Sequence, residues 1–70
     1  MKDLKEFRTG EAEGYDIYDS FGQEKSKDGK TVVVFEKHGA RIRIPDPVGS
    51  LKIHEDGKQV AIKKGEYTIE

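Results

Sequence analysis

The second half of the chain contains short segments in which apolar residues alternate with polar ones or are strongly β-branched. The clearest is 31–35, Thr-Val-Val-Val-Phe. β-Branched side chains favour an extended backbone, and apolar residues on both faces are typical of a central strand. Residues 40–44 alternate cleanly, which predicts a strand with Ile42 and Ile44 facing the core. A tight turn at 38–39 would join the two segments into a β-hairpin.

A second hairpin is predicted closer to the C-terminus. Residues 51–54 and 59–63 both alternate, and the Asp-Gly pair at 56–57 between them favours a tight turn. In the returning strand, Val60 and Ile62 are expected to face the core because they are two positions apart.

The first half of the chain carries a weaker strand signal. Residues 14–21 alternate in part, which predicts a strand with Tyr15, Ile17 and Phe21 on one face. The other face of this strand would then carry Asp16, Tyr18 and Ser20. The following stretch, residues 22–30, has no apolar member and is expected to form a loop that ends in an Asp-Gly turn.

The N-terminal residues 1–9 place Leu4 and Phe7 three positions apart among charged side chains. This spacing suits one face of a short helix, with Gly10 as a natural stop. A helix this short is marginally stable in isolation, so it would need the sheet for support. An irregular or strand-like arm is the alternative.

Together with a last short strand over 67–69, these segments predict a mainly β fold. The expected architecture is a small antiparallel meander of five to six strands that forms a small barrel or a compact sandwich, with the short N-terminal helix as an optional addition. The 70 residues suffice for one domain, so residues 1–70 are taken as a single small β-rich domain. Its core must be thin, because a domain of this size buries about 60% of the surface that its unfolded chain exposes.

The composition excludes several classes of protein. There is no cysteine, so neither a disulfide nor a cysteine-based zinc site can form. The formal net charge of −1 predicts no strong overall attraction to nucleic acid or to an anionic membrane. No apolar run is long enough to span a bilayer, and the first residues lack the apolar core of a secretory signal. We therefore expect a soluble, cytoplasmic protein without a membrane partner.

Residues suited to catalysis are few and poorly placed. None of the serines, Ser20, Ser26 and Ser50, lies in a Gly-x-Ser-x-Gly turn. His38 is expected in a turn and His54 on the outward side of a strand, where histidines are usually solvated. The acidic residues do not follow the spacing of a calcium-binding loop, and no glycine-rich phosphate-binding sequence occurs. The chain is therefore expected not to be an enzyme and to use no metal or cofactor.

Charge is distributed unevenly along the chain. Residues 10–24 contain no Lys or Arg but hold five carboxylates interleaved with tyrosines, whereas basic residues outnumber acidic ones over 30–64. The simplest interpretation is self-complementation, in which the acidic strand lies beside outward Arg41 and Arg43 in the same sheet. Opposite charges on neighbouring strands would then support strand pairing.

The leading functional hypothesis is a non-enzymatic interaction module that binds another protein through the acidic, tyrosine-bearing segment. Tyrosine offers a large, rigid contact area, and carboxylates attract a partner with a basic patch. The candidate partner-binding residues are Tyr15, Asp16, Tyr18 and Asp19. In an extreme form, the segment would imitate a phosphate backbone and the protein would inhibit a nucleic-acid-binding partner.

The alternative is a small β-barrel that binds nucleic acid through a basic strand face. Its candidate residues, Arg41, Arg43, Lys52 and His54, could line one outward face of neighbouring strands and neutralise phosphates. Single-strand binders also need aromatic side chains among the basic ones so that bases can stack. The tyrosines expected to be exposed lie among carboxylates instead, which weighs against this alternative.

Overall fold

The structure is a computed structural model that describes residues 7–70. Its strands pair antiparallel, and no α-helix occurs in this part of the chain. In chain order the strands are Arg8–Ala12 (β1), Tyr15–Lys25 (β2), Thr31–Glu36 (β3), Arg41–Pro45 (β4), Leu51–Ile53 (β5), Gln59–Lys63 (β6) and Thr68–Ile69 (β7). The predicted mainly β, antiparallel fold is confirmed.

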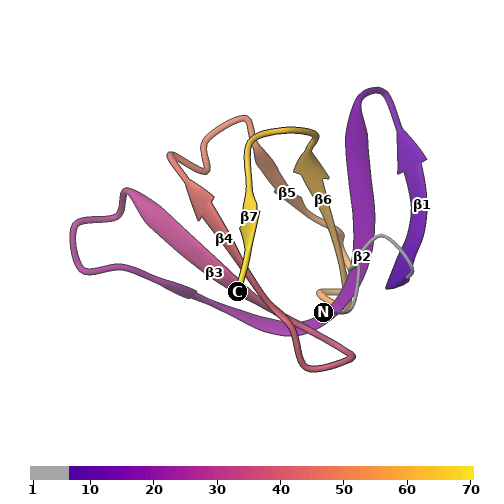
Figure 1. Cartoon of the computed structure of the whole chain (residues 1–70), viewed down its shortest axis with the longest axis horizontal. Helices are drawn as coiled ribbons and strands as arrows, with labels where there is room; N and C mark the ends of the chain where they lie inside the picture. Colours follow the sequence, from indigo (N-terminus) through magenta and orange to yellow (C-terminus); the bar gives the residue numbers. More distant parts are fainter. Residues whose placement is uncertain (1–6) are drawn as a thin grey trace.

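The long strand β2 belongs to two sheets, and Figure 1 shows the bend between its halves. Its first half, residues 15–19, pairs with β1 and β6, and β6 pairs in turn with β5. Its second half, residues 20–25, pairs with β3, which pairs with β4 and through it with β7. We call the first group sheet A and the second group sheet B.

The two sheets form an open sandwich rather than a closed barrel. The order of paired strands is β5-β6-β2-β3-β4-β7, with β1 beside the first half of β2, and the end strands β5 and β7 are not paired with each other. The meander has one strand more than the five to six expected, because β1 adds to sheet A. The choice between barrel and sandwich depends on which distant strands pair, and short-range alternation carries no information about that.

Within residues 7–70, the core consists of seven buried side chains from four strands, namely Tyr18, Val32, Val34, Ile42, Ile44, Val60 and Ile62. The inward positions predicted for β4 and β6 are confirmed, because the alternating apolar residues of each strand share one face. A core of this size uses one face of each sheet. The outer faces and the open ends of the sandwich are therefore the places for functional groups.

The two faces of β2 are grouped as the alternation predicts up to Ser20, and the structure shows which of them is inward. The face that carries Asp16, Tyr18 and Ser20 is buried, while Tyr15 and Ile17 lie half-buried on the outer face of sheet A. Alternation groups residues by face but does not tell which face is inward. The Tyr18 ring fills the space between the sheets, and the tyrosine hydroxyl is hydrogen-bonded there, so burial of its polar end carries no penalty.

A β-bulge at Phe21 breaks the alternation that grouped this residue with Tyr15 and Ile17. Ser20 pairs with Glu36 and Gly22 pairs with Phe35, so Phe21 is the extra residue between two consecutive pairs. Its side chain is consequently 73% exposed.

The loop predicted over residues 22–30 is shorter than expected, because β2 continues to Lys25. Backbone pairing with β3 needs no apolar side chains on this half of β2, since its outer side faces solvent. The predicted turn chemistry is confirmed. The Asp28 carboxylate accepts a hydrogen bond from the Lys30 backbone N–H (3.0 Å), and the Asp56 carboxylate accepts the equivalent bond from Lys58 (2.8 Å).

The optional helix at the N-terminus is not present in the described residues. Arg8 and Thr9 belong to β1, in agreement with the strand-like alternative. Leu4, which would have formed the helix face together with Phe7, lies outside the described residues. Phe7 itself packs against the core.

Candidate functional site

The four predicted partner-binding residues do not form one surface. Tyr18 is fully buried and Asp16 is 4% exposed, so their expected exposure is wrong. Tyr15 and Asp19 lie half-buried on the outer face of sheet A. The Tyr15 hydroxyl donates a hydrogen bond to the Gly49 carbonyl oxygen (2.6 Å), which fixes this ring against the segment before β5.

Asp16 and Tyr18 belong to a polar network that joins sheet A to the segment before β7. The Asp16 carboxylate accepts hydrogen bonds from the Arg8 guanidinium (3.0 Å) and from the Tyr67 hydroxyl (2.8 Å). The hydroxyl oxygens of Tyr67 and Tyr18 are 2.9 Å apart. Burial, and then the hydrogen bonds to Tyr18 and Asp16, raise the pKa of Tyr67 above its usual value. The network pairs buried polar groups with one another, which is a structural role.

The carboxylates of the acidic segment form ion pairs with basic residues on β1 and after β6 rather than with those on β4. Glu11 is paired with Lys64, and its carboxylate also lies 3.6 Å from the Arg8 guanidinium. The hydrogen bond from Lys64 is the main cause that lowers the pKa of Glu11. The predicted pairing of this segment with Arg41 and Arg43 is wrong, because β3 separates β2 from β4.

The four predicted basic residues lie in two places rather than on one face. Arg41 and Arg43 are on β4 of sheet B, whereas Lys52 is on β5 of sheet A and His54 follows that strand. The Lys52 ammonium nitrogen lies 4.6 Å from the centre of the Tyr15 ring, within cation–π range. The expectation that these strands are neighbours is wrong, and the two arginines remain as a basic candidate on one strand.

The arginines of β4 share the outer face of sheet B with two phenylalanines. The rings of Phe21 and Phe35 are stacked, with centroids 6.2 Å apart and an interplanar angle of 13°. The central guanidinium carbon of Arg41 lies 5.6 Å from the centre of the Phe35 ring. Arg41 is opposite Phe35 in the strand register, and Arg43 is two residues further along β4. We call the set Phe21, Phe35, Arg41 and Arg43 the Phe–Arg face.

Two features keep the Phe–Arg face open. Gly22 is the β2 residue that pairs with Phe35, so no side chain from that position covers the ring. Arg43 is paired with Glu70, but Arg41 has no ion-pair partner in the part of the chain that the structure describes. The face therefore offers a largely exposed aromatic ring and a guanidinium without an ion-pair partner, both next to the Phe35 ring.

Neither phenylalanine was predicted as a functional residue, because the alternation only grouped Phe21 with Tyr15 and Ile17, and Phe35 was part of a strand that is apolar on both faces. Two signals were available. Phe21 directly precedes a long polar stretch that offers nothing to cover an aromatic ring. A strand that is apolar on both faces also exposes one face unless a second layer covers it.

Comparisons with known proteins offer no guide to function. No family model, curated protein or solved structure matches this chain. Over residues 7–70, no helix has the length and apolar character needed to cross a membrane, and no three His, Asp or Glu side chains are grouped to hold a metal ion. Function must therefore be sought in the chemistry of the surfaces themselves.

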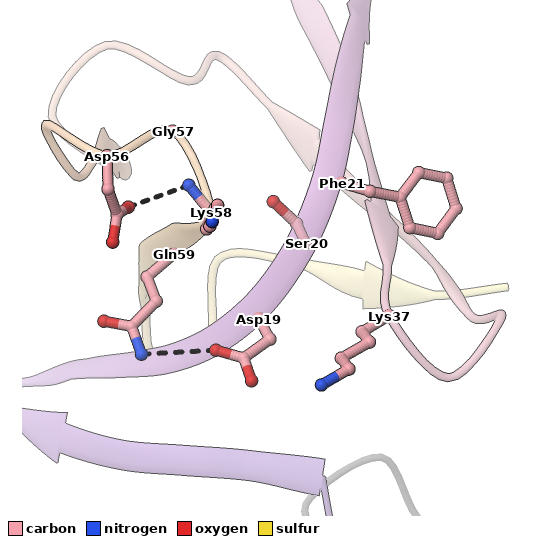
Figure 2. Close-up of a pocket in the computed structure, with 8 residues that line it drawn as sticks. All are labelled: Asp19, Ser20, Phe21, Lys37, Asp56, Gly57, Lys58 and Gln59. Atoms are coloured by element: carbon pink, nitrogen blue, oxygen red, sulfur yellow. Dashed lines mark hydrogen bonds between the residues drawn. The ribbon is translucent and has the colours of Figure 1, made fainter.

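A hollow of about 670 Å³ lies beside Phe21, between β2 and the turn that joins β5 to β6 (Figure 2). Its charged lining side chains are Asp19, Lys37, Asp56 and Lys58. The Gln59 side chain donates a hydrogen bond to the Asp19 carboxylate (3.2 Å). The hollow thus carries two cations and two carboxylates, and one of the carboxylates is already engaged with a neutral amide.

The second carboxylate of the hollow, Asp56, is engaged as well. It accepts the backbone hydrogen bond from Lys58, and the His54 imidazole lies 3.3 Å away. The backbone hydrogen bond is the main cause that lowers the pKa of Asp56. His54 therefore lies beside the carboxylate of a turn residue and not on one face with Arg41 and Arg43.

His38 is partly exposed, as expected of a turn residue, and it is also paired. Its Nδ1 lies 2.6 Å from the carboxylate of Glu36, which is fully buried, and its ring stacks on Phe7 with centroids 4.0 Å apart. A carboxylate and an imidazole in contact occur in hydrolases, where the imidazole also binds a nucleophilic hydroxyl. No serine hydroxyl is hydrogen-bonded to His38 among residues 7–70. Glu36 also accepts the His38 backbone N–H (2.8 Å), so the pair stabilises the β3–β4 turn.

Proposed function

We propose that this protein is a non-enzymatic module that binds single-stranded nucleic acid through the Phe–Arg face. The observation that carries the proposal is the Phe21 ring, 73% exposed and stacked on Phe35 beside the Arg41 guanidinium. An exposed aromatic ring next to cations is the combination that single-strand binders use.

The chemistry of the face suits a nucleic acid strand in two ways. A base can stack on the free surface of Phe21 whatever its sequence, because every base has a π-face. The Arg41 guanidinium can hold a phosphate with two parallel hydrogen bonds. Arg43 adds a second cation once phosphate displaces Glu70 from it.

A single strand fits this face better than a duplex does. Stacking on Phe21 requires a base that is not already stacked between its neighbours. The major groove of DNA admits a helix or a two-stranded ribbon, whereas the Phe–Arg face spans three neighbouring strands of sheet B. Because the net charge of the chain is −1, attraction is local to this face and should weaken quickly as salt is added.

The test is fluorescence anisotropy of a labelled single-stranded oligonucleotide with the wild-type protein and the Phe21→Ala variant. Loss of one base–aromatic stack of about 1–3 kcal/mol should weaken binding by about 5- to 150-fold. Phe21 is largely exposed, so its removal should leave folding intact.

Val48→Ala is the matched control, because Val48 is 98% exposed and lies outside the Phe–Arg face. It removes exposed apolar surface without touching the proposed site, and its affinity should equal that of the wild type. The proposal is wrong if the wild-type protein does not bind at low salt, or if Phe21→Ala binds as tightly as the wild type.

A protein partner is the second candidate, because an exposed aromatic ring beside an arginine is also typical of protein-binding hot spots. A pull-down with nuclease-treated extract separates the two candidates. A protein that is captured by the wild type after nuclease treatment and lost with Phe21→Ala would favour the second candidate. The same experiment with Tyr15→Ala tests the part of the acidic segment that remains half-exposed, and unchanged recovery would remove that segment as a binding surface.

A further inference from the structure

We propose that the hollow beside Phe21 receives a phosphate of the nucleic acid strand whose base stacks on Phe21; this inference rests on the proposed function. Phe21 contributes to both sites, because it lines the hollow and also forms the aromatic pair of the Phe–Arg face. A strand anchored on Phe21 therefore has its next phosphate within reach of the hollow.

The two lysines of the hollow flank β2 at consecutive residues. The Lys37 backbone N–H donates a hydrogen bond to the Asp19 carbonyl oxygen (3.0 Å), and the Ser20 backbone N–H donates to the Lys58 carbonyl oxygen (2.8 Å). Consecutive residues of a strand direct their backbone groups to opposite edges. Lys37 and Lys58 are thus held on either side of β2, at the point where the two halves of the strand meet.

Both lysines are available to bind an anion. Neither ammonium group forms an ion pair with any residue over 7–70, in contrast to Lys63 and Lys64. Figure 2 shows the Lys37 and Lys58 side chains on the two sides of β2. An ammonium group with three free donors is a common phosphate ligand.

The Ser20 hydroxyl is a further unused donor at the same place. Ser20 is 6% exposed and lines the hollow, yet its hydroxyl oxygen has no hydrogen-bond partner among the described residues. In Figure 2 it points from β2 toward the Gly57–Lys58 side of the hollow, opposite to Phe21. Buried hydroxyls are nearly always paired, so a water molecule or a ligand atom would complete the hydrogen bonding of this one.

The two carboxylates of the hollow determine how the phosphate is bound. Asp19 and Asp56 accept hydrogen bonds from the Gln59 amide and the Lys58 backbone, and they cancel the formal charge of the two lysines. A neutral site has little affinity for free phosphate. A phosphate tethered to a base on Phe21 is present at a high effective concentration, so the hollow acts as the second contact of a bound strand.

The test is the salt dependence of oligonucleotide binding by the wild type and by the K37Q/K58Q double variant. Each phosphate contact on a single strand contributes about 0.7 to the slope of log affinity against log salt. Loss of the lysines should reduce the magnitude of this slope by about 0.7 and weaken binding by about tenfold at low salt. Both side chains are exposed, so the variant should fold, and far-ultraviolet circular dichroism verifies this.

The charge-matched control is K63Q/K64Q, which removes two lysines far from Phe21 that are paired with Glu66 and Glu11. It should leave the slope within experimental error of the wild type. The inference alone is overturned if the wild type binds in a Phe21-dependent way while K37Q/K58Q behaves like K63Q/K64Q. Absence of wild-type binding at low salt overturns the proposed function, and the phosphate site with it.

Discussion

At the level of single residues, the buried polar groups of this small core differ in how well they are paired. The Asp16 carboxylate has two donors, Arg8 and Tyr67, from opposite ends of the chain. The Ser50 hydroxyl donates a hydrogen bond to Glu66 (2.8 Å). The Ser20 hydroxyl has no partner over residues 7–70. An unpaired buried hydroxyl lowers the free energy of unfolding, whereas a paired one supports it. Loss of the hydroxyl should therefore change this free energy in opposite directions at Ser20 and at Ser50.

The substitutions Ser20→Ala and Ser50→Ala test this difference. Ser20→Ala should leave the free energy of unfolding unchanged or raise it by up to about 1 kcal/mol, because an unpaired polar atom is removed. Ser50→Ala should lower it by about 1 kcal/mol, because Glu66 loses its donor. Urea denaturation of both variants gives the comparison, and a clear destabilisation by Ser20→Ala would contradict the assignment of its hydroxyl as unpaired.

Tyr67 should make stability depend on alkaline pH. Its pKa is raised in the folded state from the ordinary 10.0, so the folded protein keeps its proton where the unfolded chain begins to lose it. The stabilisation is complete below pH 10 and is lost progressively as pH rises above that value. At neutral pH, Tyr67→Phe should be less stable than the wild type by about 1–3 kcal/mol, because Asp16 loses a donor.

The informative measurement for Tyr67 is the difference in unfolding free energy between wild type and Tyr67→Phe across pH. This difference should narrow above pH 10, since the variant has no proton to lose at this position. All other titratable residues are present in both proteins, so the difference in unfolding free energy reports on the change at position 67. A difference in unfolding free energy that stays constant above pH 10 would show that the hydrogen-bond network does not raise the pKa of Tyr67.

At the level of elements, the hairpin turns depend on glycines in the left-handed region. Gly57 has φ of 70° in the turn between β5 and β6, the turn that carries Asp56 and Lys58 to the hollow. A side chain at such a position clashes with the following carbonyl. Gly10 in β1 differs, because its backbone is not in this region and no neighbouring atom lies within 4 Å of an added Cβ.

Gly57→Ala should therefore lower the free energy of unfolding by about 1 kcal/mol or more, and Gly10→Ala by less than about 0.5 kcal/mol. Thermal denaturation of the two variants provides the comparison. Equal effects at both positions would mean that the backbone conformation of the β5–β6 turn does not limit stability.

At the level of the whole molecule, the shared strand β2 couples the two sheets. Its first half holds sheet A together and its second half begins sheet B, while Tyr18 from its centre lies in the common core. Neither sheet retains a buried face without the other. The domain should consequently unfold in one cooperative step, as small single domains usually do.

Two probes with different reporters test this cooperativity. Tyrosine fluorescence reports on the core and sheet A through Tyr18 and Tyr15, and far-ultraviolet circular dichroism reports on all strands. Their urea transitions should coincide, with a slope near 1 kcal/mol per molar urea because little surface is exposed on unfolding. Separate midpoints would mean that one sheet survives the loss of the other.

The positions of β3 to β7 and of the turns between them followed from local patterns, whereas β1 and the second half of β2 did not. The hairpins around 38–39 and 56–57, and the inward side chains of β4 and β6, agree with the sequence prediction. β-Branched alternation and Asp-Gly turns act between residues that are close along the chain, so neighbouring residues suffice to identify them. The absence of cysteine and the near-balanced charge likewise restricted the possible chemistry without any structure.

The candidate site depended on the assembled sheets. The buried face of β2 depends on contacts that exist only in the folded protein. The Tyr18 ring packs between the two sheets, and the Asp16 carboxylate is hydrogen-bonded to Arg8 and Tyr67. The bulge after Ser20 then turned Phe21 outward onto Phe35. Contacts between strands that are distant in sequence decide burial and strand neighbours, and a two-residue period is identical for either face. For this reason the aromatic and cationic side chains that make up the Phe–Arg face emerged only from the tertiary structure.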